Sequence, residues 1–438
     1  MKILVIGSGA REHAIIKALE RSPKSKTLFC FGTTVNPGIS QFCEHYSVGD
    51  LCDSEEILAK AKFWGIQLAI IGPEAPLAEG LADKLWQMDI PTIGPTKALA
   101  QIETSKEFAR DLMKQYQIPG LPRYQKFSSL DQVDEFLHQL GPQNYVVKAN
   151  GLMGGKGVKV AGDHLHSFAE ARSFCNDILH SKQRFIIEEK LLGQEFSFMC
   201  FADGKKLIPM PLVQDHKRAY NGDSGPNTGG MGSYSDVNHS LPFLKDEEVE
   251  QAFAINNAIY QALSTECNEP YLGILYGSYI ATKTGVYVIE FNARFGDPEA
   301  LNIFSILESD FLEICQSIVA GNLTEDKVKF AKQATVCKYA VPEGYPDKPM
   351  KNFVVDFSRV SDKTNLYLGS VHKIDHMVIA AGSRTAACVG IANTISEAEI
   401  LAEHQVSMIN GPLFHREDIG TEQLIKNRIE QMKRLRNS

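Results

Sequence analysis

The chain has 438 residues, of which 44% are hydrophobic and 22% charged, and its formal net charge is −8. This length predicts about two to four globular domains. The acidic balance argues against general nucleic-acid binding. The chain contains no apolar run of about 18 residues and no signal peptide, so we expect a cytoplasmic protein without a membrane segment. Its nine cysteines include no CxxC pair, which indicates reduced thiols and no zinc site.

The first domain is predicted from alternating apolar strands and amphipathic helices. Strands are expected at 3–7, 27–31, 68–72 and 91–94, and helices at 11–21, 54–64 and 76–88. Ser54 is placed to cap the second helix. The alternation predicts a doubly wound parallel sheet covered on both faces, with ligands bound beyond the carboxyl ends of its strands.

The rest of the chain predicts mixed α+β structure. Helices at 96–103 and 105–116 precede a compact α+β unit of lid size, and antiparallel strands with turns at Asp203-Gly204 and Thr284-Gly285 follow. A single long helix is expected from Pro298 to Ala320. The last hundred residues predict three strands and a helix without a dense polar cluster, and we interpret them as a structural domain. The predicted domains are 1–103, a central domain of 104–122 and 192–328, a lid of 123–191, and 329–438.

A glycine-rich turn between two strands is the most informative pattern. Residues 145–161 read YVVKANGLMGGKGVKVA, and their glycines let backbone N–H groups approach an anion beside Lys148 and Lys156. The spacing excludes a Walker A loop, because only three residues separate Gly151 from the Gly155-Lys156 pair. A simple hairpin turn with a solvated lysine is an equally good interpretation of this motif alone.

A polar strand predicts a metal site. In VIEFNAR, Glu290, Asn292 and Arg294 alternate onto one face, together with Val288. Carboxylate and amide oxygens suit magnesium, and an arginine beyond them can stabilise a transferring phosphoryl group. The alternative is an exposed strand face with a Glu–Arg ion pair.

Three further segments carry polar groups of ligand-binding type. Residues 214–235 form a long glycine-rich segment with both signs of charge, for which disorder is the alternative. In IIEEKLLGQEFSF the backbone of 188–191 can pair with a purine edge and Glu195 with a ribose, although ordinary surface charge explains the segment as well. The first turn, GSGAREH, fails as a dinucleotide fingerprint because Glu12 replaces the third glycine, yet it suits a single phosphate near Arg11.

Together these motifs resemble the ATP-grasp superfamily and, within it, the phosphoribosylamine–glycine ligase family. The resemblance rests on GSGAREHAI, IIGPEAPLAEGL, GPTKALAQIETSKEFARD, the glycine-rich turn, IIEEKLLGQEFSF, QDHKRAYNGDSGPNTGGMGSYS, VIEFNARFGDPE and the C-terminal HREDIG. Asn150 and Met153 depart from the family pattern in the turn, which puts the details of lid closure in doubt.

The resemblance implies an activity and a set of site residues. Enzymes of this family join glycine to 5-phosphoribosylamine with ATP and Mg²⁺, or Mn²⁺ as the alternative, through glycyl phosphate in purine biosynthesis. Implied ATP contacts are Lys106, Lys148, Gly155, Lys156, Glu188, Glu189, Lys190, Leu191, Glu195, Arg218 and Asn227. Implied substrate contacts are Gly9, Arg11, Glu74, Asp215, Lys217, Arg294 and Asp297, with Arg294 also catalytic and Glu290 and Asn292 as metal ligands.

The resemblance also bears on partners and alternatives. We expect a monomer, with a dimer as the alternative, and no nucleic-acid or membrane partner. Another ATP-grasp purine enzyme and a non-catalytic nucleotide-binding protein are the competing interpretations.

Overall fold

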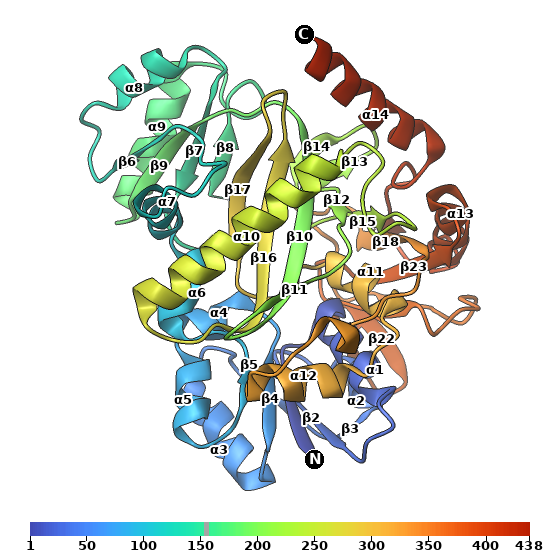
Figure 1. Ribbon diagram of the computed structural model, residues 1–438. Helices are drawn as coiled ribbons and strands as arrows, with labels where there is room; N and C mark the ends of the chain where they lie inside the picture. Colours follow the sequence, from blue (N-terminus) through green and yellow to red (C-terminus); the bar gives the residue numbers. More distant parts are fainter. Residues whose placement is uncertain (153–156) are drawn as a thin grey trace.

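The computed structural model describes residues 1–152 and 157–438 (Figure 1). At the N-terminal end, five parallel strands form a sheet in the order β3-β2-β1-β4-β5. They are β1 (Lys2–Ile6), β2 (Thr27–Gly32), β3 (Cys43–Val48), β4 (Leu68–Ile71) and β5 (Thr92–Ile93). The accompanying helices are α1 (Ala10–Glu20), α2 (Pro37–Ser40), α3 (Ser54–Trp64), α4 (Glu74–Ala78) and α5 (Leu81–Gln87). The predicted parallel α/β sheet is confirmed.

Three local predictions for this domain were wrong. Asp53, rather than Ser54, caps α3, because its carboxylate accepts the N–H of Glu56. The helix expected at 76–88 is interrupted by Gly80, whose φ of 76° lies in the left-handed region. Strand β3 escaped prediction because its polar sequence lies at the sheet edge, where little burial is required.

The segment predicted as a lid contains an antiparallel sheet in the order β6-β9-β7-β8. Its elements are β6 (Tyr124–Phe127), α8 (Val133–Leu140), β7 (Tyr145–Ala149), β8 (Val158–Val160), α9 (Phe168–His180) and β9 (Phe185–Glu189), and it follows α6 (Lys97–Thr104) and α7 (Lys106–Gln115). Strands β7 and β8 pair directly, so the two strands predicted around the glycine-rich turn are confirmed. The lid has its own hydrophobic core, separate from the main one.

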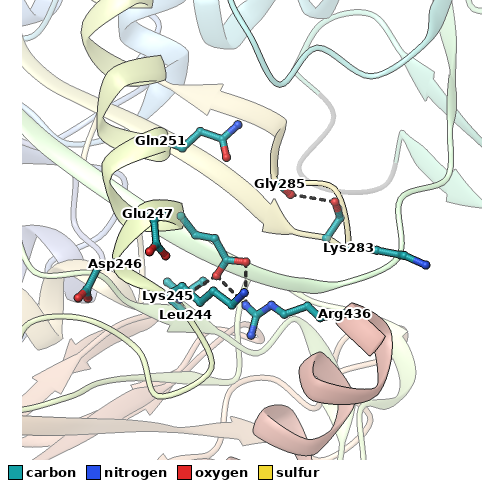
Figure 2. A pocket seen from close by; sticks show the side chains of 10 residues that line it. Leu244, Lys245, Asp246, Glu247, Gln251, Lys283, Gly285 and Arg436 are labelled. Carbon is teal, nitrogen blue, oxygen red and sulfur yellow. Dashed lines mark hydrogen bonds and ion pairs between the residues drawn. The ribbon is translucent and has the colours of Figure 1, made fainter. Parts of the chain in front are cut away.

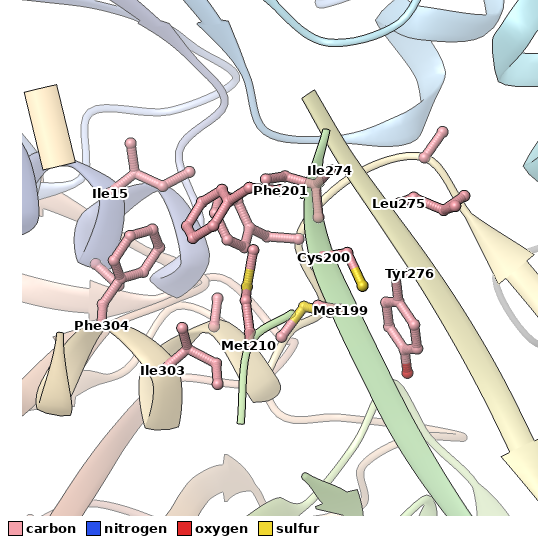
Figure 3. Packing of buried hydrophobic residues seen from close by; sticks show 14 of the residues in the cluster. Ile15, Met199, Cys200, Phe201, Met210, Ile274, Leu275, Tyr276, Ile303 and Phe304 are labelled. Carbon is pink, nitrogen blue, oxygen red and sulfur yellow. The ribbon is translucent and has the colours of Figure 1, made fainter. Parts of the chain in front are cut away.

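The central sheet is antiparallel in the order β11-β10-β16-β17. It comprises β10 (Gln194–Asp203), β11 (Leu207–Pro209), β16 (Leu272–Ala281) and β17 (Val286–Asn292), with α10 (Asp246–Cys267) crossing it in Figure 1. Figure 3 shows Phe201 of β10 and Ile15 of α1 packed in the same core, together with Phe304. The N-terminal and central sheets therefore share one hydrophobic core.

The long helix predicted after Pro298 is two helices, α11 (Glu299–Ile306) and α12 (Phe311–Ala320). Leu307 is extended, and the Asp310 carboxylate caps α12 by accepting the N–H groups of Leu312 and Glu313. An apolar pattern continues through a break of this kind, which is why periodicity did not reveal it.

The C-terminal sheet incorporates pieces of the polar segment 214–235. Its strand path is β12-β15-β18-β23-β20, with β24 also paired to β18, and a second small sheet is β19-β22-β21. The segment supplies β12 (Gln214–Asp215), β13 (Arg218–Tyr220), β14 (Ser224–Asn227) and β15 (Gly232–Ser235). The remaining elements are η1 (Glu325–Lys327), β18 (Ala334–Pro342), β19 (Val354–Val355), β20 (Leu366–Leu368), β21 (Val371–Ile374), β22 (Met377–Ala380), β23 (Ala386–Ala392), α13 (Ile395–Val406), β24 (Leu413–Phe414) and α14 (Glu422–Asn437).

The expectation that this tail lacks a dense polar cluster was wrong. The ammonium of Lys338, whose side chain is 0% exposed, lies 2.6 Å from carboxylates of both Glu399 and Glu403. The Arg416 side chain is equally buried and pairs with Asp223 and Asp418. These charges are scattered along the sequence and meet only in the fold. Across 1–152 and 157–438, no helix is long and apolar enough to cross a membrane.

Candidate active site

A β-bulge in β17 determines how the predicted metal ligands are presented. Glu290 lies opposite Ser278 and Val288 opposite Tyr279, so Ile289 is the extra residue. An extra residue reverses the alternation of side chains. Val288 is therefore buried in the core together with Phe291, and the prediction that it shares the face of Glu290 was wrong.

The carbonyl exposed by this bulge anchors the lid. Ile289 O accepts hydrogen bonds from Arg110 Nη2 (2.7 Å) and Lys148 Nζ (3.1 Å). Both cations also grip Glu188, with Arg110 Nε 2.5 Å and Lys148 Nζ 2.6 Å from its carboxylate. Burial raises the pKa of Glu188, but Arg110 and Lys148 outweigh it and lower the pKa to about 2. The Glu188 side chain thus fixes the position of Lys148. Because this carboxylate is occupied, only the backbone of residues 188–191 is available to contact a purine base.

Four cations lie near Glu290. No hydrogen bond or ion pair joins its carboxylate to any other residue that the structure describes. Burial raises its pKa, but Lys217, Lys106, Lys148 and Arg294 together hold the pKa below its usual value. A half-buried carboxylate that faces several cations without pairing to one of them is arranged to share those charges with a ligand.

Lys106 and Lys217 flank Glu290 from two directions. Lys106 Nζ donates to Gly151 O (3.0 Å) at the base of the glycine-rich turn. Burial lowers its pKa, while nearby Glu290 opposes that change. Lys217 Nζ lies 3.7 Å from Glu195, and its pKa is raised because Glu195, Glu290 and Asp215 overcome the effect of burial.

Arg294 connects β17 to the loops of the N-terminal domain. Its guanidinium lies 3.1 Å from Glu103 and 3.6 Å from Glu74 and donates to Asn292 Oδ1 (3.3 Å). Arg11 Nη1 donates to the carbonyl of the next residue, Phe295 (3.2 Å). The Glu74 and Arg11 loops, both predicted to contact substrate, therefore reach the end of β17. Glu103, which sequence reasoning missed, also accepts the N–H of Ala293 (2.7 Å).

Glu12 fills the space beneath the first glycine turn. Its carboxylate accepts the N–H of Gly9 (2.7 Å) and Arg11 Nε (2.6 Å). A Cβ on Gly7 or Gly72 would lie 2.7 Å or 2.0 Å from this side chain. Because the N–H of Gly9 is already bonded to Glu12, Arg11 is a better candidate than Gly9 for a substrate contact.

Two carboxylates, the half-buried Asp215 and the buried Glu299, lie near enough for the charge of Glu299 to act on Asp215. Glu299 Oε1 accepts hydrogen bonds from Tyr276 (2.5 Å) and Ser197 (2.9 Å), while Asp215 accepts the N–H of His216 (2.7 Å). Burial and the charge of Glu299 raise the pKa of Asp215 well above its usual value. Such a pair favours binding of a small cation or ammonium group. Glu299 was not among the predicted site residues.

Asp297 is held by the C-terminal domain. Its carboxylate accepts Tyr339 OH (2.5 Å) and lies 3.0 Å from Arg384 Nη2. Arg384 Nη1 also donates to the carbonyl of Gly229 (2.6 Å) and to that of Asp297 (2.8 Å). Arg384 therefore joins two of the predicted site loops, a role that its isolated position in the sequence did not indicate.

The remaining predicted nucleotide contacts line the lid and the β13–β14 hairpin. Lys190 Nζ donates to Ala161 O (2.7 Å), and Glu189 pairs with Arg123 (3.1 Å). Arg218 pairs with Asp163 beyond β8 (2.5 Å) and lies opposite Asn227 in the hairpin. Leu191 follows β9, whereas Gly155 and Lys156 lie outside the described residues.

An open pocket lies away from this cluster. It has a volume of about 900 Å³ and lies between the start of α10 and Arg436 of α14 (Figure 2). Arg436 pairs there with Glu248 (2.6 Å), and no predicted site residue lines the cavity. Within the described ranges, no three His, Cys, Asp or Glu residues are grouped to hold a metal ion. Convergent charges around Glu290, rather than cavity size, locate the candidate site.

Comparison with known proteins agrees with the whole of this architecture. Residues 1–103 match the family described as "Phosphoribosylglycinamide synthetase, N domain", 104–300 its "ATP-grasp (A) domain" and 335–422 its "C domain". A crystal structure of phosphoribosylamine–glycine ligase from Thermotoga maritima has a TM-score of 0.79 at 24% identity, covering 95% of this chain and 100% of that one. At 13% identity, biotin carboxylase from Campylobacter jejuni has a TM-score of 0.72 over 99% of this chain and 95% of its own.

Relatives that match over their full length are named phosphoribosylamine–glycine ligase, like the Thermotoga maritima protein. A phosphoribosylamine–glycine ligase of Methanosarcina barkeri (strain Fusaro / DSM 804) is 46% identical over 436 residues, covering 100% of both chains. One of Methanocorpusculum labreanum (strain ATCC 43576 / DSM 4855 / Z) is 46% identical over 439 residues with the same coverage. The family resemblance expected from the motifs is thus confirmed, and the chain belongs to the phosphoribosylglycinamide synthetase family.

Proposed function

We propose that this protein is a phosphoribosylamine–glycine ligase that joins glycine to 5-phosphoribosylamine at the expense of ATP in purine biosynthesis. The observation that carries the proposal is the convergence of Lys106, Lys148, Lys217 and Arg294 on the half-buried carboxylate of Glu290. These cations come from the helix before the lid, the lid itself, the 214–235 segment and the end of β17. Only a ligand with several negative charges, such as a nucleoside triphosphate with its metal, uses all of them together.

Glu290 and Asn292 suit a magnesium or manganese ion. Both offer oxygen atoms, and the amide oxygen of Asn292 has one long hydrogen bond, to Arg294 (3.3 Å). Two protein oxygens are few for Mg²⁺, which normally completes its octahedron with phosphate and water oxygens. A bound ion would screen the charge of the transferring phosphoryl group.

The proposed reaction has two steps. A glycine carboxylate oxygen attacks the γ-phosphorus, ADP leaves, and glycyl phosphate forms. The amino group of phosphoribosylamine then attacks the carbonyl carbon, phosphate leaves, and the amide nitrogen loses a proton. Lys106 and Lys148 would bind the ATP phosphates, and Arg294 would stabilise the phosphoryl group as it moves.

Glycine binding is proposed at the Asp215–Glu299 pair. Glycine carries an ammonium group that must be held while its carboxylate reacts. Glu299 is buried and Asp215 half-buried, and neither carboxylate has an ion pair within the part of the chain that the structure describes, so an ammonium would relieve their mutual repulsion. Arg11 and Glu74, at the end of β17, are the proposed contacts for phosphoribosylamine.

The lid would exclude water from the acyl phosphate. Residues 123–191 have a separate core, and Lys148 and Asp163 connect them to Ile289 and Arg218 outside the segment. Closure over the nucleotide would protect a readily hydrolysed intermediate. The division of the chain into 1–103, 104–122 with 192–328, 123–191 and 329–438 belongs to this proposal, as do a monomeric state and a cytoplasmic location.

The test is substrate-dependent ADP release. Purified protein is incubated with ATP, Mg²⁺ and phosphoribosylamine, and glycine, formate or bicarbonate is added in separate reactions. ADP release only with glycine, together with formation of glycinamide ribonucleotide, is the expected result. Release that depends on formate or bicarbonate would instead identify another ATP-grasp purine enzyme, and no release with any of the three would refute ligase activity.

A further inference from the structure

We propose that the C-terminal domain positions the nucleotide-binding hairpin β13–β14 through an ion-pair clasp of Asp223, Arg416, Asp418 and Arg428. The inference rests on the proposed function, which assigns Arg218 and Asn227 of this hairpin to ATP. The four members of this clasp are positioning residues: Asp223 belongs to the turn of the hairpin, the other three come from the C-terminal domain, and their contacts hold the hairpin rather than the substrate.

The clasp grips the hairpin at its turn and along its first strand. Arg416 Nη1 donates to Asp223 (2.9 Å) and to the backbone carbonyl of Arg218 (3.2 Å). Arg428 pairs with the second oxygen of Asp223. Asp418, itself bonded twice by Arg416 at 2.8 Å, accepts the N–H of Gly222 (2.9 Å). Hairpin backbone and side chains are thus held by residues about 200 positions later in the chain.

Burial and charge balance make the clasp rigid. The Arg416 side chain is 0% exposed and that of Arg428 15%. The two arginines and two aspartates neutralise one another, which burial of charge requires. The adjacent His216 is also buried, and burial with the charges of Arg428 and Arg416 lowers its pKa to about 3, so it adds no charge. The hairpin therefore has one favoured position relative to the C-terminal domain.

That position also determines contact with the lid. Arg416 holds the backbone of Arg218, whose side chain extends in the opposite direction to Asp163 (2.5 Å), in the loop after β8. A route of direct contacts accordingly runs from the C-terminal domain through Arg218 to the lid. Loosening the clasp would displace Arg218 and Asn227 and weaken nucleotide binding. The carboxylates of Asp215 and Glu299 are held by hydrogen bonds outside the clasp, so the proposed glycine site should change less.

The experiment measures nucleotide affinity separately from glycine use. Asp223→Asn removes the charge shared by both arginines at a side chain that is 35% exposed, and Arg428→Met removes one arginine. Arg434→Met is the matched control, because Arg434 lies on the same helix with its side chain 83% exposed. Binding of a non-hydrolysable ATP analogue with Mg²⁺ is measured by calorimetry, and glycine KM is measured at saturating ATP.

We expect Asp223→Asn and Arg428→Met each to weaken analogue binding about tenfold, within the usual range of coupling between sites. Glycine KM should change less than about twofold, Arg428→Lys should restore affinity, and Arg434→Met should match the parent. Unchanged analogue affinity in both clasp variants, or an equal rise in glycine KM, would overturn the proposal. Analogue binding does not require ligase activity, so this failure is distinct from absence of glycine-dependent ADP release.

Discussion

Replacing Glu188 by glutamine should destabilise the junction between the lid and the central sheet by about 3 kcal/mol, as breakage of a buried ion pair typically does. The carboxylate is 3% exposed and lies 2.5 Å from Arg110 and 2.6 Å from Lys148. The lowered pKa, about 2 against a usual 4.5, gives a similar size of about 3 kcal/mol at ~1.36 kcal/mol per unit. Glutamine keeps the shape and leaves two buried cations uncompensated.

The pH dependence follows from the same pKa. Because folding lowers the pKa of Glu188, its contribution is fully present above the unfolded value near 4.5 and is lost as pH falls towards about 2. The stability difference between the parent and Glu188→Gln should therefore be constant near neutral pH and shrink below about 4.5. Urea unfolding followed by tryptophan fluorescence and far-UV circular dichroism at several pH values measures this difference.

Glu189→Gln provides the matched control. Its partner Arg123 is 65% exposed, so this pair should contribute less than about 1 kcal/mol. If Glu188→Gln cost no more stability than Glu189→Gln at neutral pH, the Arg110–Glu188–Lys148 network would not hold the predicted lid to the central sheet. A stability difference that grew on acidification would contradict the assigned sign of the pKa shift.

Two further predictions concern chemistry. Glu290→Gln removes a carboxylate from among four cations and should lower kcat by about 100-fold or more. The lysines should still bind the ATP analogue. Near-normal turnover would exclude Glu290 as a metal ligand. Because burial and Glu299 raise the pKa of Asp215, while Lys217 and Arg384 oppose them, Asp215 must lose a proton before it can hold an ammonium. Glycine KM should therefore fall as pH rises through that pKa, and this dependence should disappear in Asp215→Asn; a KM that rose with pH in the parent would refute the role.

Structure that depends on residues close together in the sequence was predictable, because the residues that determine it are neighbours in the chain. Alternating apolar strands and helices predicted the parallel sheet, and the two strands around the glycine-rich turn pair as expected. Breaks within apolar patterns were not predictable in this way. Gly80 divides one predicted helix into two, and a cap by Asp310 divides another. Neither break was predicted, because the hydrophobic periodicity continues across both positions.

By itself, the sequence determined the family, the parallel α/β character of the N-terminal domain and which residues are chemically suited to phosphate and metal. Only the tertiary structure decided how those residues are paired. It assigned Glu188 to an ion-pair network, placed Glu299 beside Asp215, and brought Arg384 and Arg416 to loops that lie far away in the chain. Ion pairs and desolvation depend on distances of a few ångströms between side chains from distant segments, and those distances exist only after the chain has folded.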